Sequence, residues 1–117
     1  MFFESRNIND ILVIRPMVER IDAENSSSFK GWMVDYILQG KEKVALDLSE
    51  VEFMDSSGLS ALLSTVKTMK NRGRLVFFGV RPNVGKLFSI TRLDRGVFEI
   101  HPDEQSAVEA LRKDENS

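Results

Sequence analysis

A strand, a polar turn and a helix follow one another between Lys43 and Arg72, and this segment constrains the fold more than any other. Its first part, 44–48, is an apolar run broken only by Asp47, which is typical of a strand buried in a sheet. Its last part places apolar side chains on one face at helical spacing: Leu59, Leu62, Leu63, Val66 and Met69. The pattern predicts a buried strand followed by a helix that packs against the sheet.

The turn between this strand and this helix reads Asp55-Ser56-Ser57-Gly58. Asp and Ser side chains accept hydrogen bonds from the free N–H groups of a first helical turn, so we expect an N-cap here. A helix N-terminus carries partial positive charge and stabilises anions, including a phosphate added to Ser56 or Ser57. At the other end of the helix, Gly73 is expected to supply the C-cap.

Length and composition bound the class of protein. A chain of 117 residues can bury one core of its own but is too short for two domains. A formal net charge of -2 argues against nucleic acid as a direct partner. The chain has no cysteine and a single histidine, His101, which excludes disulfides, thiolate metal sites and a histidine cluster for zinc.

Neither a membrane span nor a secretion signal is expected. No apolar run approaches the roughly 20 residues that a membrane-spanning helix needs. The first residues, M-F-F-E-S-R-N, lack the basic and apolar segments of a signal peptide. We therefore expect a cytoplasmic protein that does not insert into a membrane.

The N-terminal third predicts a hairpin and a helix. Residues 2–7 and 11–18 read as strands joined by a turn at Asn9-Asp10, and Pro16 favours an edge position or a bulge for the second strand. Asp22 or Asn25 can cap the helix that follows, which runs to about residue 39 and ends at Gly40.

The C-terminal half alternates strands and helices. We expect a strand over 74–80, a short helix opened by Pro82-Asn83, a strand over 97–100 and a last helix that begins at Pro102-Asp103-Glu104. Alternating strands and helices with short turns predict the α/β class, with helices packed on a sheet. With the hairpin included, this is one domain built on a mixed sheet of about five strands flanked by about four helices.

No catalytic site or cofactor site can be assembled from these residues. His101 reads as a loop histidine, and Glu50, Glu52 and Asp55 read as a solvated loop rather than an acid–base pair. The segment 79–86 matches a phosphate-binding loop only in its glycine and lysine spacing. A basic cluster, Lys67, Lys70, Arg72 and Arg74, is explained by the C-terminus of a helix. The sequence therefore favours a protein that is not an enzyme and holds no cofactor or metal.

The segment D-L-S-E-V-E-F-M-D-S-S-G-L-S-A-L-L, residues 47–63, closely resembles the central motif of the anti-sigma factor antagonists, small bacterial proteins of the STAS family. Residues 21–29 resemble the first strand-to-helix junction of that family, and residues 81–88 resemble its third helix. The resemblance implies a STAS domain over residues 1–112, with 113–117 as a loose C-terminal tail.

The resemblance also implies a function. Unphosphorylated antagonists bind an anti-sigma factor that is also a serine kinase, and this releases a sigma factor for transcription. The kinase phosphorylates the serine that follows the motif aspartate, here Ser56, and a serine/threonine phosphatase reverses the switch. Asp22, Asp55, Ser57 and Gly58 would then contribute to the partner-binding surface, with Gly58 giving the kinase close access to the hydroxyl.

Two alternatives remain open at this stage. Asp22 can be a plain N-cap as well as a partner contact, and Ser56 and Ser57 can be caps without modification. The same domain could also be an accessory adaptor subunit of a membrane transport ATPase, whereas a weak nucleotide hydrolase is a third and more distant interpretation. One departure from the family pattern is Glu19, which stands where the pattern usually has a glycine. The backbone shape of the loop that precedes Asp22 depends on this position.

Overall fold

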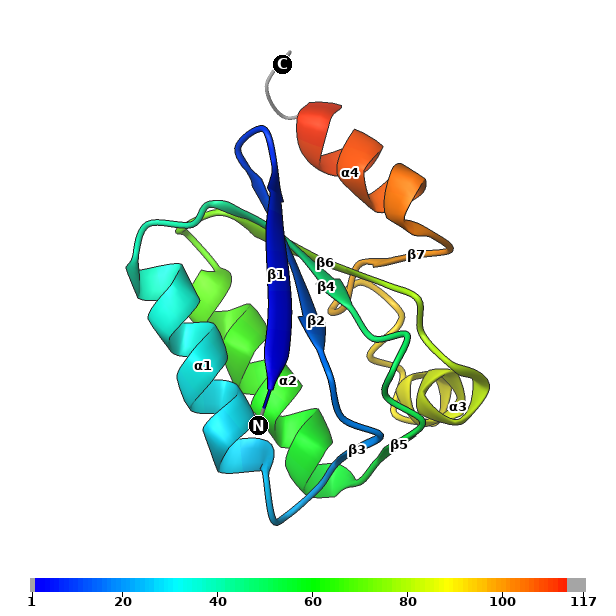
Figure 1. Ribbon diagram of the computed structural model, residues 1–117. Helices are drawn as coiled ribbons and strands as arrows, with labels where there is room; N and C mark the ends of the chain where they lie inside the picture. The colour runs from blue at the N-terminus through cyan, green and yellow to red at the C-terminus, as the bar shows by residue number, and fades with distance from the viewer. Residues whose placement is uncertain (1, 114–117) are drawn as a thin grey trace.

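The computed structural model describes residues 2–113 as one α/β layer structure with a five-stranded mixed sheet and four helices (Figure 1). The strands are β1 (Phe3–Ile8), β2 (Ile11–Pro16), β3 (Arg20–Ile21), β4 (Lys43–Asp47), β5 (Phe53–Met54), β6 (Arg74–Phe78) and β7 (Ile100–His101). The helices are α1 (Ser26–Leu38), α2 (Ser56–Met69), α3 (Pro82–Ile90) and α4 (Glu104–Lys113). The predicted fold class is confirmed.

The main sheet has the order β1-β2-β4-β6-β7. β1 and β2 form the predicted antiparallel hairpin, and the other neighbours pair in parallel. The hairpin turn contains Asn9 in the left-handed region, with a φ of 56°, which asparagine tolerates better than most residues. Parallel neighbours require crossover connections, and α1 and α2 supply them between β2, β4 and β6.

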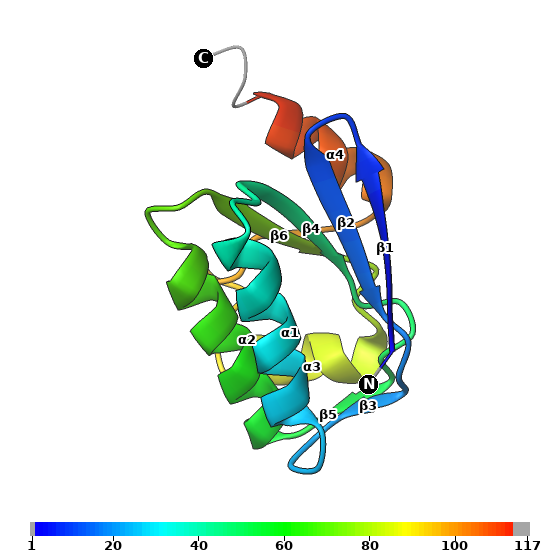
Figure 2. The same ribbon diagram turned by 60° about the vertical axis from the view of Figure 1, so that its left-hand side comes forward.

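Helices cover both faces of this sheet. α1 and α2 lie side by side on one face with α3 near its end, whereas α4 lies on the opposite face (Figures 1 and 2). The side chains of β2 point alternately to these two faces. Leu12 and Ile14 belong to the larger core cluster, whereas Ile11 and Val13 belong to a smaller cluster with α4. β2 is therefore buried on both of its faces.

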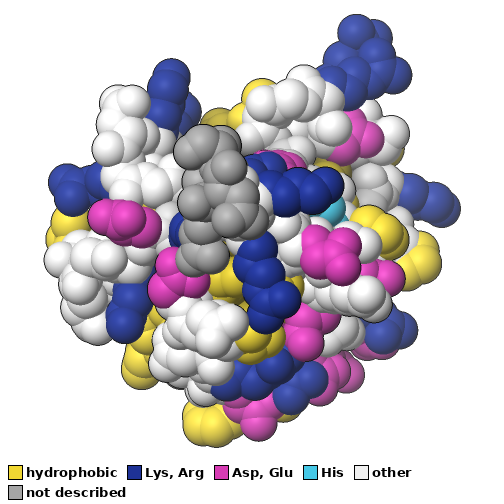
Figure 3. Space-filling model, turned by 90° about the horizontal axis from the view of Figure 1, so that it is seen from above, with side chains coloured by type: hydrophobic (Ala, Val, Ile, Leu, Met, Phe, Trp, Pro, Cys, Tyr) yellow, Lys and Arg dark blue, Asp and Glu magenta, His cyan; other side chains and the backbone are white. Residues whose placement is uncertain are grey.

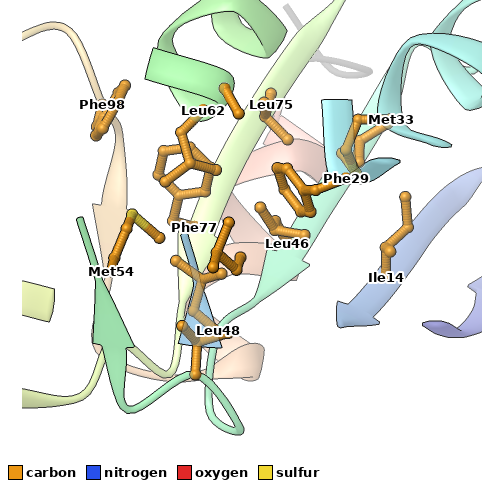
Figure 4. Packing of buried hydrophobic residues seen from close by; sticks show 14 of the residues in the cluster. Ile14, Phe29, Met33, Leu46, Leu48, Met54, Leu62, Leu75, Phe77 and Phe98 are labelled. Atoms are coloured by element: carbon orange, nitrogen blue, oxygen red, sulfur yellow. The ribbon is translucent and has the colours of Figure 1, made fainter. Parts of the chain in front are cut away.

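The larger core is filled by aromatic and aliphatic side chains from every layer. Figure 4 shows Phe77 of β6 between Leu62 of α2 and Leu46 of β4, with Phe29 of α1 beside them. The rings of Phe77 and Phe98 meet edge to face, with centroids 5.0 Å apart, a favourable arrangement for aromatic pairs. This core holds α2 against the sheet and so fixes the position of its N-terminus.

Three local expectations were wrong. β2 is not an edge strand, because it lies between β1 and β4. Pro16 is the last residue of β2 and lies beyond the three residues that pair with β4, so its missing N–H removes no hydrogen bond to β4. Gly73 has no positive φ; Asn71, with a φ of 71°, takes the left-handed position after α2, although the Gly73 N–H still donates to the Met69 carbonyl (3.1 Å). The last strand is short, since β7 begins only at Ile100 and Val97 is exposed.

At the C-terminus, α4 packs Ala107, Val108 and Leu111 into the smaller core. Lys113 is the last residue of α4. Residues 114–117 of the expected loose tail lie outside the described residues, so the domain limits of 1–112 and 113–117 stay a prediction.

Candidate functional site

Asp55 is the N-cap of α2, and its side chain organises the first helical turn. Its backbone is extended, with φ of −103° and ψ of −172°, and its Oδ1 accepts hydrogen bonds from the N–H groups of Ser57 (2.9 Å) and Gly58 (3.1 Å). This is the bonding expected of an aspartate N-cap, and the negative charge also faces the positive end of the helix. Asp55 therefore has a complete structural role in addition to any contact with a partner.

Ser56 is the first residue of α2 and is exposed. Its hydroxyl makes no hydrogen bond with another residue in the described part of the chain. Ser57 is partly buried, and its N–H is already bonded to Asp55. The cap is thus made by Asp55 and not by Ser56, which leaves the Ser56 hydroxyl accessible at a helix N-terminus that stabilises added negative charge.

Asp22 and Asp55 are brought to the same edge by a short parallel ladder. β3 and β5 pair Ile21 with Met54, so each aspartate directly follows the last paired residue of its strand. The Ile21 carbonyl also accepts from the N–H of Asp55 (3.3 Å). Figures 1 and 2 show this ladder at the end of the molecule where α1 and α2 begin. Two aspartates from distant parts of the sequence therefore share the edge at which Ser56 begins α2.

Asp22 does not cap α1 in the way expected. The N-cap of α1 is Asn25, whose side chain accepts from the N–H of Asp22 (2.9 Å) and not from the helix. Asp22 accepts from the N–H of Glu24 (3.0 Å), and its backbone carbonyl accepts from Ser26 (2.8 Å). Asn25, one of the two predicted residues, is therefore the N-cap by position. The side chains of Asn25 and Asp22 accept hydrogen bonds within the preceding turn, so neither bonds the first turn of α1.

Gly58 is buried against the small sheet. A Cβ at this position would lie 2.4 Å from the Ile21 carbonyl oxygen and 2.7 Å from Cγ of Met54. The absence of a side chain therefore allows α2 to approach β3, which is a sufficient reason for glycine here. The expected role of Gly58 in giving a kinase access to Ser56 is untested and stays a prediction.

Glu19 occupies an ordinary backbone conformation, because the non-glycine residues with positive φ in the described chain are Asn9, Asn71 and Arg92. Its carbonyl accepts from the N–H groups of Glu52 (2.7 Å) and Phe53 (3.0 Å). The loop therefore does not need the conformational freedom of glycine, and the ladder of β3 and β5 forms with glutamate in place.

Two residues at this site escaped the sequence analysis. The guanidinium of Arg20 lies 4.3 Å from the centre of the Phe53 ring, and its Nε lies 3.5 Å from Oδ2 of Asp22. Phe53 is 39% exposed, which is unusual for a large aromatic side chain. Arg and aromatic residues dominate binding energy at many interfaces. Phe53 lies inside the family motif, whereas Arg20 lies outside it, and a two-residue strand is too short for a periodic pattern.

Glu99, Arg74 and His101 form an ion-paired cluster at the edge of the sheet where β6 pairs with β7. Glu99 accepts from Nε of Arg74 (2.8 Å) and lies 2.8 Å from Nε2 of His101. Burial opposes the charge of Glu99, but these two partners outweigh burial and hold its pKa below its ordinary value. His101 is not the loop residue that the sequence predicts, because it is the last residue of β7 and is partly buried.

Neither a metal site nor a membrane span is found in residues 2–113. No group of three or more metal-ligating side chains comes together in this range. None of the helices within it has both the length and the apolar character that crossing a membrane would require.

The sequence profile of the STAS domain matches residues 3–107, which is nearly the whole described chain. The chain belongs to the STAS domain family. A proposed anti-sigma factor antagonist of Thermotoga maritima is 32% identical over 114 residues, covering 95% of this chain and 98% of that protein. The anti-sigma-B factor antagonist of Listeria monocytogenes is 34% identical over 74 residues, covering 62% of this chain and 65% of its own.

Solved structures of STAS proteins share this fold. The crystal structure of the Thermotoga maritima protein superposes with a TM-score of 0.87 at 28% identity, covering 94% of both chains. The unphosphorylated form of the anti-sigma factor antagonist SpoIIAA has a TM-score of 0.68 at 21% identity, covering 95% of this chain and 98% of its own. Part of the murine anion transporter Slc26a9 also superposes, with a TM-score of 0.79 at 18% identity, covering 92% of this chain and 18% of that chain. At these last two identities the likeness concerns the fold alone.

Proposed function

We propose that this protein is an anti-sigma factor antagonist whose partner is an anti-sigma factor with serine kinase activity. The unphosphorylated protein binds this partner, and the sigma factor that the partner held is released. The partner phosphorylates Ser56, the complex dissociates, and a serine/threonine phosphatase restores the binding form. The observation that carries the proposal is the position of Ser56, an accessible hydroxyl at the first residue of α2 within the family motif. The full-length similarity to relatives named as anti-sigma factor antagonists supports it.

The mechanism is a change of surface charge, and the fold itself need not change. A phosphate adds about -1.5 to -2 charges and three acceptor oxygens. At the N-terminus of α2 the added charge is stabilised by the helix dipole, and the Asp55 cap uses backbone N–H groups rather than the Ser56 hydroxyl. The phosphorylated protein is therefore expected to remain folded.

The partner meets a different surface after phosphorylation. Asp22 and Asp55 already lie at this edge, so a phosphate on Ser56 makes the patch strongly acidic. Arg20 and the exposed ring of Phe53 lie within the same patch and would anchor the partner beside the serine. A partner that fits the unmodified patch would lose close contacts and meet like charge. A change of about 3 kcal/mol in binding free energy corresponds to more than a hundredfold in affinity.

The first test is phosphopeptide mapping of the protein isolated from its own host in two growth states. We expect one phosphate on Ser56, in an amount that differs between the states. A phosphate confined to Ser57 would move the switch by one residue. If no phosphate is found in either state and the protein co-purifies with a membrane complex, the adaptor interpretation replaces this one.

The second test measures binding to the partner recovered from that host. Ser56→Ala should bind like the unmodified protein and resist phosphorylation, whereas Ser56→Asp should bind much more weakly. Gln105→Glu is the matched control, because it adds one negative charge to the exposed first turn of α4 on the opposite face of the sheet. Equal affinity of the two Ser56 variants would exclude the charge mechanism.

A further inference from the structure

A hollow of about 400 Å³ lies at the other end of α2, between that helix, the start of β6 and the segment before β7. Its walls are apolar and include Leu63 and Val66 of α2, Leu75 of β6 and Val97. Val97 is 44% exposed, so its side chain is presented to solvent at the rim. A second hollow of about 490 Å³ adjoins the first and shares Leu75 and Val97 with it.

The rim of the first hollow is basic. Lys67 and Lys70 of α2 line it, no Asp or Glu does, and neither lysine forms an ion pair with a residue in the range 2–113. Figure 3 views the end of the molecule where α2 finishes, and lysine and arginine side chains project at several points of its outline. The C-terminus of α2 explains why lysines are tolerated here, but it does not explain an apolar hollow beside them.

The edge of β6 is open at the bottom of this hollow. The Arg74 N–H donates to the Glu42 carbonyl (2.7 Å), so the even-numbered residues of β6 bond on the β4 side. Odd-numbered residues face the other way, and the Phe77 N–H donates to the Glu99 carbonyl (2.8 Å). Leu75 faces that same side, but the first pair with β7 is Phe77 with Ile100. Within residues 2–113, no backbone group therefore pairs with Leu75 along this edge.

We propose that this groove binds an extended segment of a partner protein that carries apolar side chains flanked by carboxylates. Main-chain groups of the segment would pair with Leu75, as in strand addition at a sheet edge. Its apolar side chains would fill the space between Val66 and Val97, and its carboxylates would meet Lys67 and Lys70. The charge of the rim selects an acidic segment over a basic one.

This site is separate from the switch at Ser56. α2 has 14 residues, so its two ends are about 20 Å apart at the usual rise per residue. Occupation of the groove leaves the surface around Ser56 free, and the inference does not depend on phosphorylation of that serine. One protein could then hold two partners at once, one at each end of α2.

The test uses a fluorescein-labelled peptide, Asp-Glu-Val-Leu-Val-Glu-Asp, titrated with the full chain and followed by fluorescence anisotropy. We expect saturable binding that weakens with added salt, since the lysines are exposed. The double variant Lys67→Glu/Lys70→Glu should bind at least about tenfold more weakly, because attraction becomes repulsion. The matched control is Lys30→Glu/Lys86→Glu, which changes the net charge equally at exposed helix positions outside the groove.

Amide NMR then locates the peptide. The signal of the Leu75 amide should shift on binding, and its hydrogen exchange should slow, while the Ser56 amide is unaffected. The absence of saturable binding, equal weakening in both double variants, or shifts centred on Ser56 would each overturn the proposal. Two other occupants are tested as well. The proposal is overturned if decanoate, a fatty acid, displaces the peptide at a concentration below the Kd of the peptide. It is also overturned if sedimentation shows that a second copy of the chain occupies the groove.

Discussion

Gly58→Ala is expected to destabilise this protein, whereas the same substitution at Gly31 is expected to stabilise it. Both glycines lie in helices, Gly58 in the first turn of α2 and Gly31 inside α1. A Cβ at Gly58 would lie 2.4 Å from the Ile21 carbonyl oxygen, but a Cβ at Gly31 would have no heavy atom within 4 Å. The pair therefore separates the effect of space from the effect of helix propensity.

The magnitudes follow from these contacts. Alanine inside a helix is favoured over glycine by about 0.5–1 kcal/mol, and this gain applies in full at Gly31. At Gly58 the new methyl group must displace backbone, and forced overpacking costs about 1–3 kcal/mol. With the middle of each range taken and the propensity gain subtracted, the net loss is about 1 kcal/mol. The clash lies between α2 and β3, so the substitution also moves the cap at Asp55 relative to Asp22.

Urea unfolding followed by circular dichroism measures both changes on one scale. With an m-value of about 2 kcal/mol/M, the midpoint for Gly58→Ala should fall by about 0.5 M, and that for Gly31→Ala should rise by a few tenths. Equal slopes for the three proteins would show that the substitutions act on stability alone. The reasoning is refuted if Gly58→Ala is as stable as the unsubstituted protein, because the Ile21 carbonyl would then not require glycine.

Two further predictions concern charged groups. Asp55→Ala should lower the free energy of unfolding by about 1 kcal/mol, because the cap on Ser57 and Gly58 is lost. Asp55→Asn should retain most of that free energy, because an amide oxygen can also accept these hydrogen bonds. Equal losses for the two variants in urea unfolding would contradict a capping role. The pKa of Glu99 is lowered in the folded state, so its contribution is present above about pH 4.5 and is lost as the pH falls through the folded-state pKa. Glu99→Gln should accordingly flatten the fall in urea midpoint between pH 5 and pH 3, roughly the range of carboxyl titration, and an unchanged slope would count against this account.

The elements with strong periodicity could be predicted from the sequence. The segment 44–69 contains a buried strand and an amphipathic helix, and β4, α2 and the Asp55 cap between them are confirmed. The hairpin of β1 and β2 is also confirmed, and its signal in the sequence is the turn at Asn9-Asp10 between two strand-like runs.

The features that were missed depend on tertiary contacts. β3 and β5 have two residues each, too few for any period, and only their pairing reveals that Asp22 and Asp55 share an edge. The sequence alone does not show why Gly58 and Gly73 are glycines. A Cβ at Gly58 would clash with the Ile21 carbonyl, and a Cβ at Gly73 would clash with the Glu42 carbonyl. The stacking of Arg20 on Phe53 likewise joins two segments far apart in the chain.

The parallel order of β2, β4 and β6 has a consequence for how the chain reaches this structure. Each parallel pair joins residues about thirty positions apart, such as Leu12 with Val44 and Val44 with Leu75, whereas the hairpin joins neighbours. Forming such distant pairs requires closing long loops first, which slows folding relative to structures built from local contacts. The β1–β2 hairpin is therefore expected to form early. The ladder of β3 and β5 pairs Ile21 with Met54, which are as distant in sequence as the residues of the central pairs. The edge that carries Ser56 is thus expected to form together with the central strands and not before them.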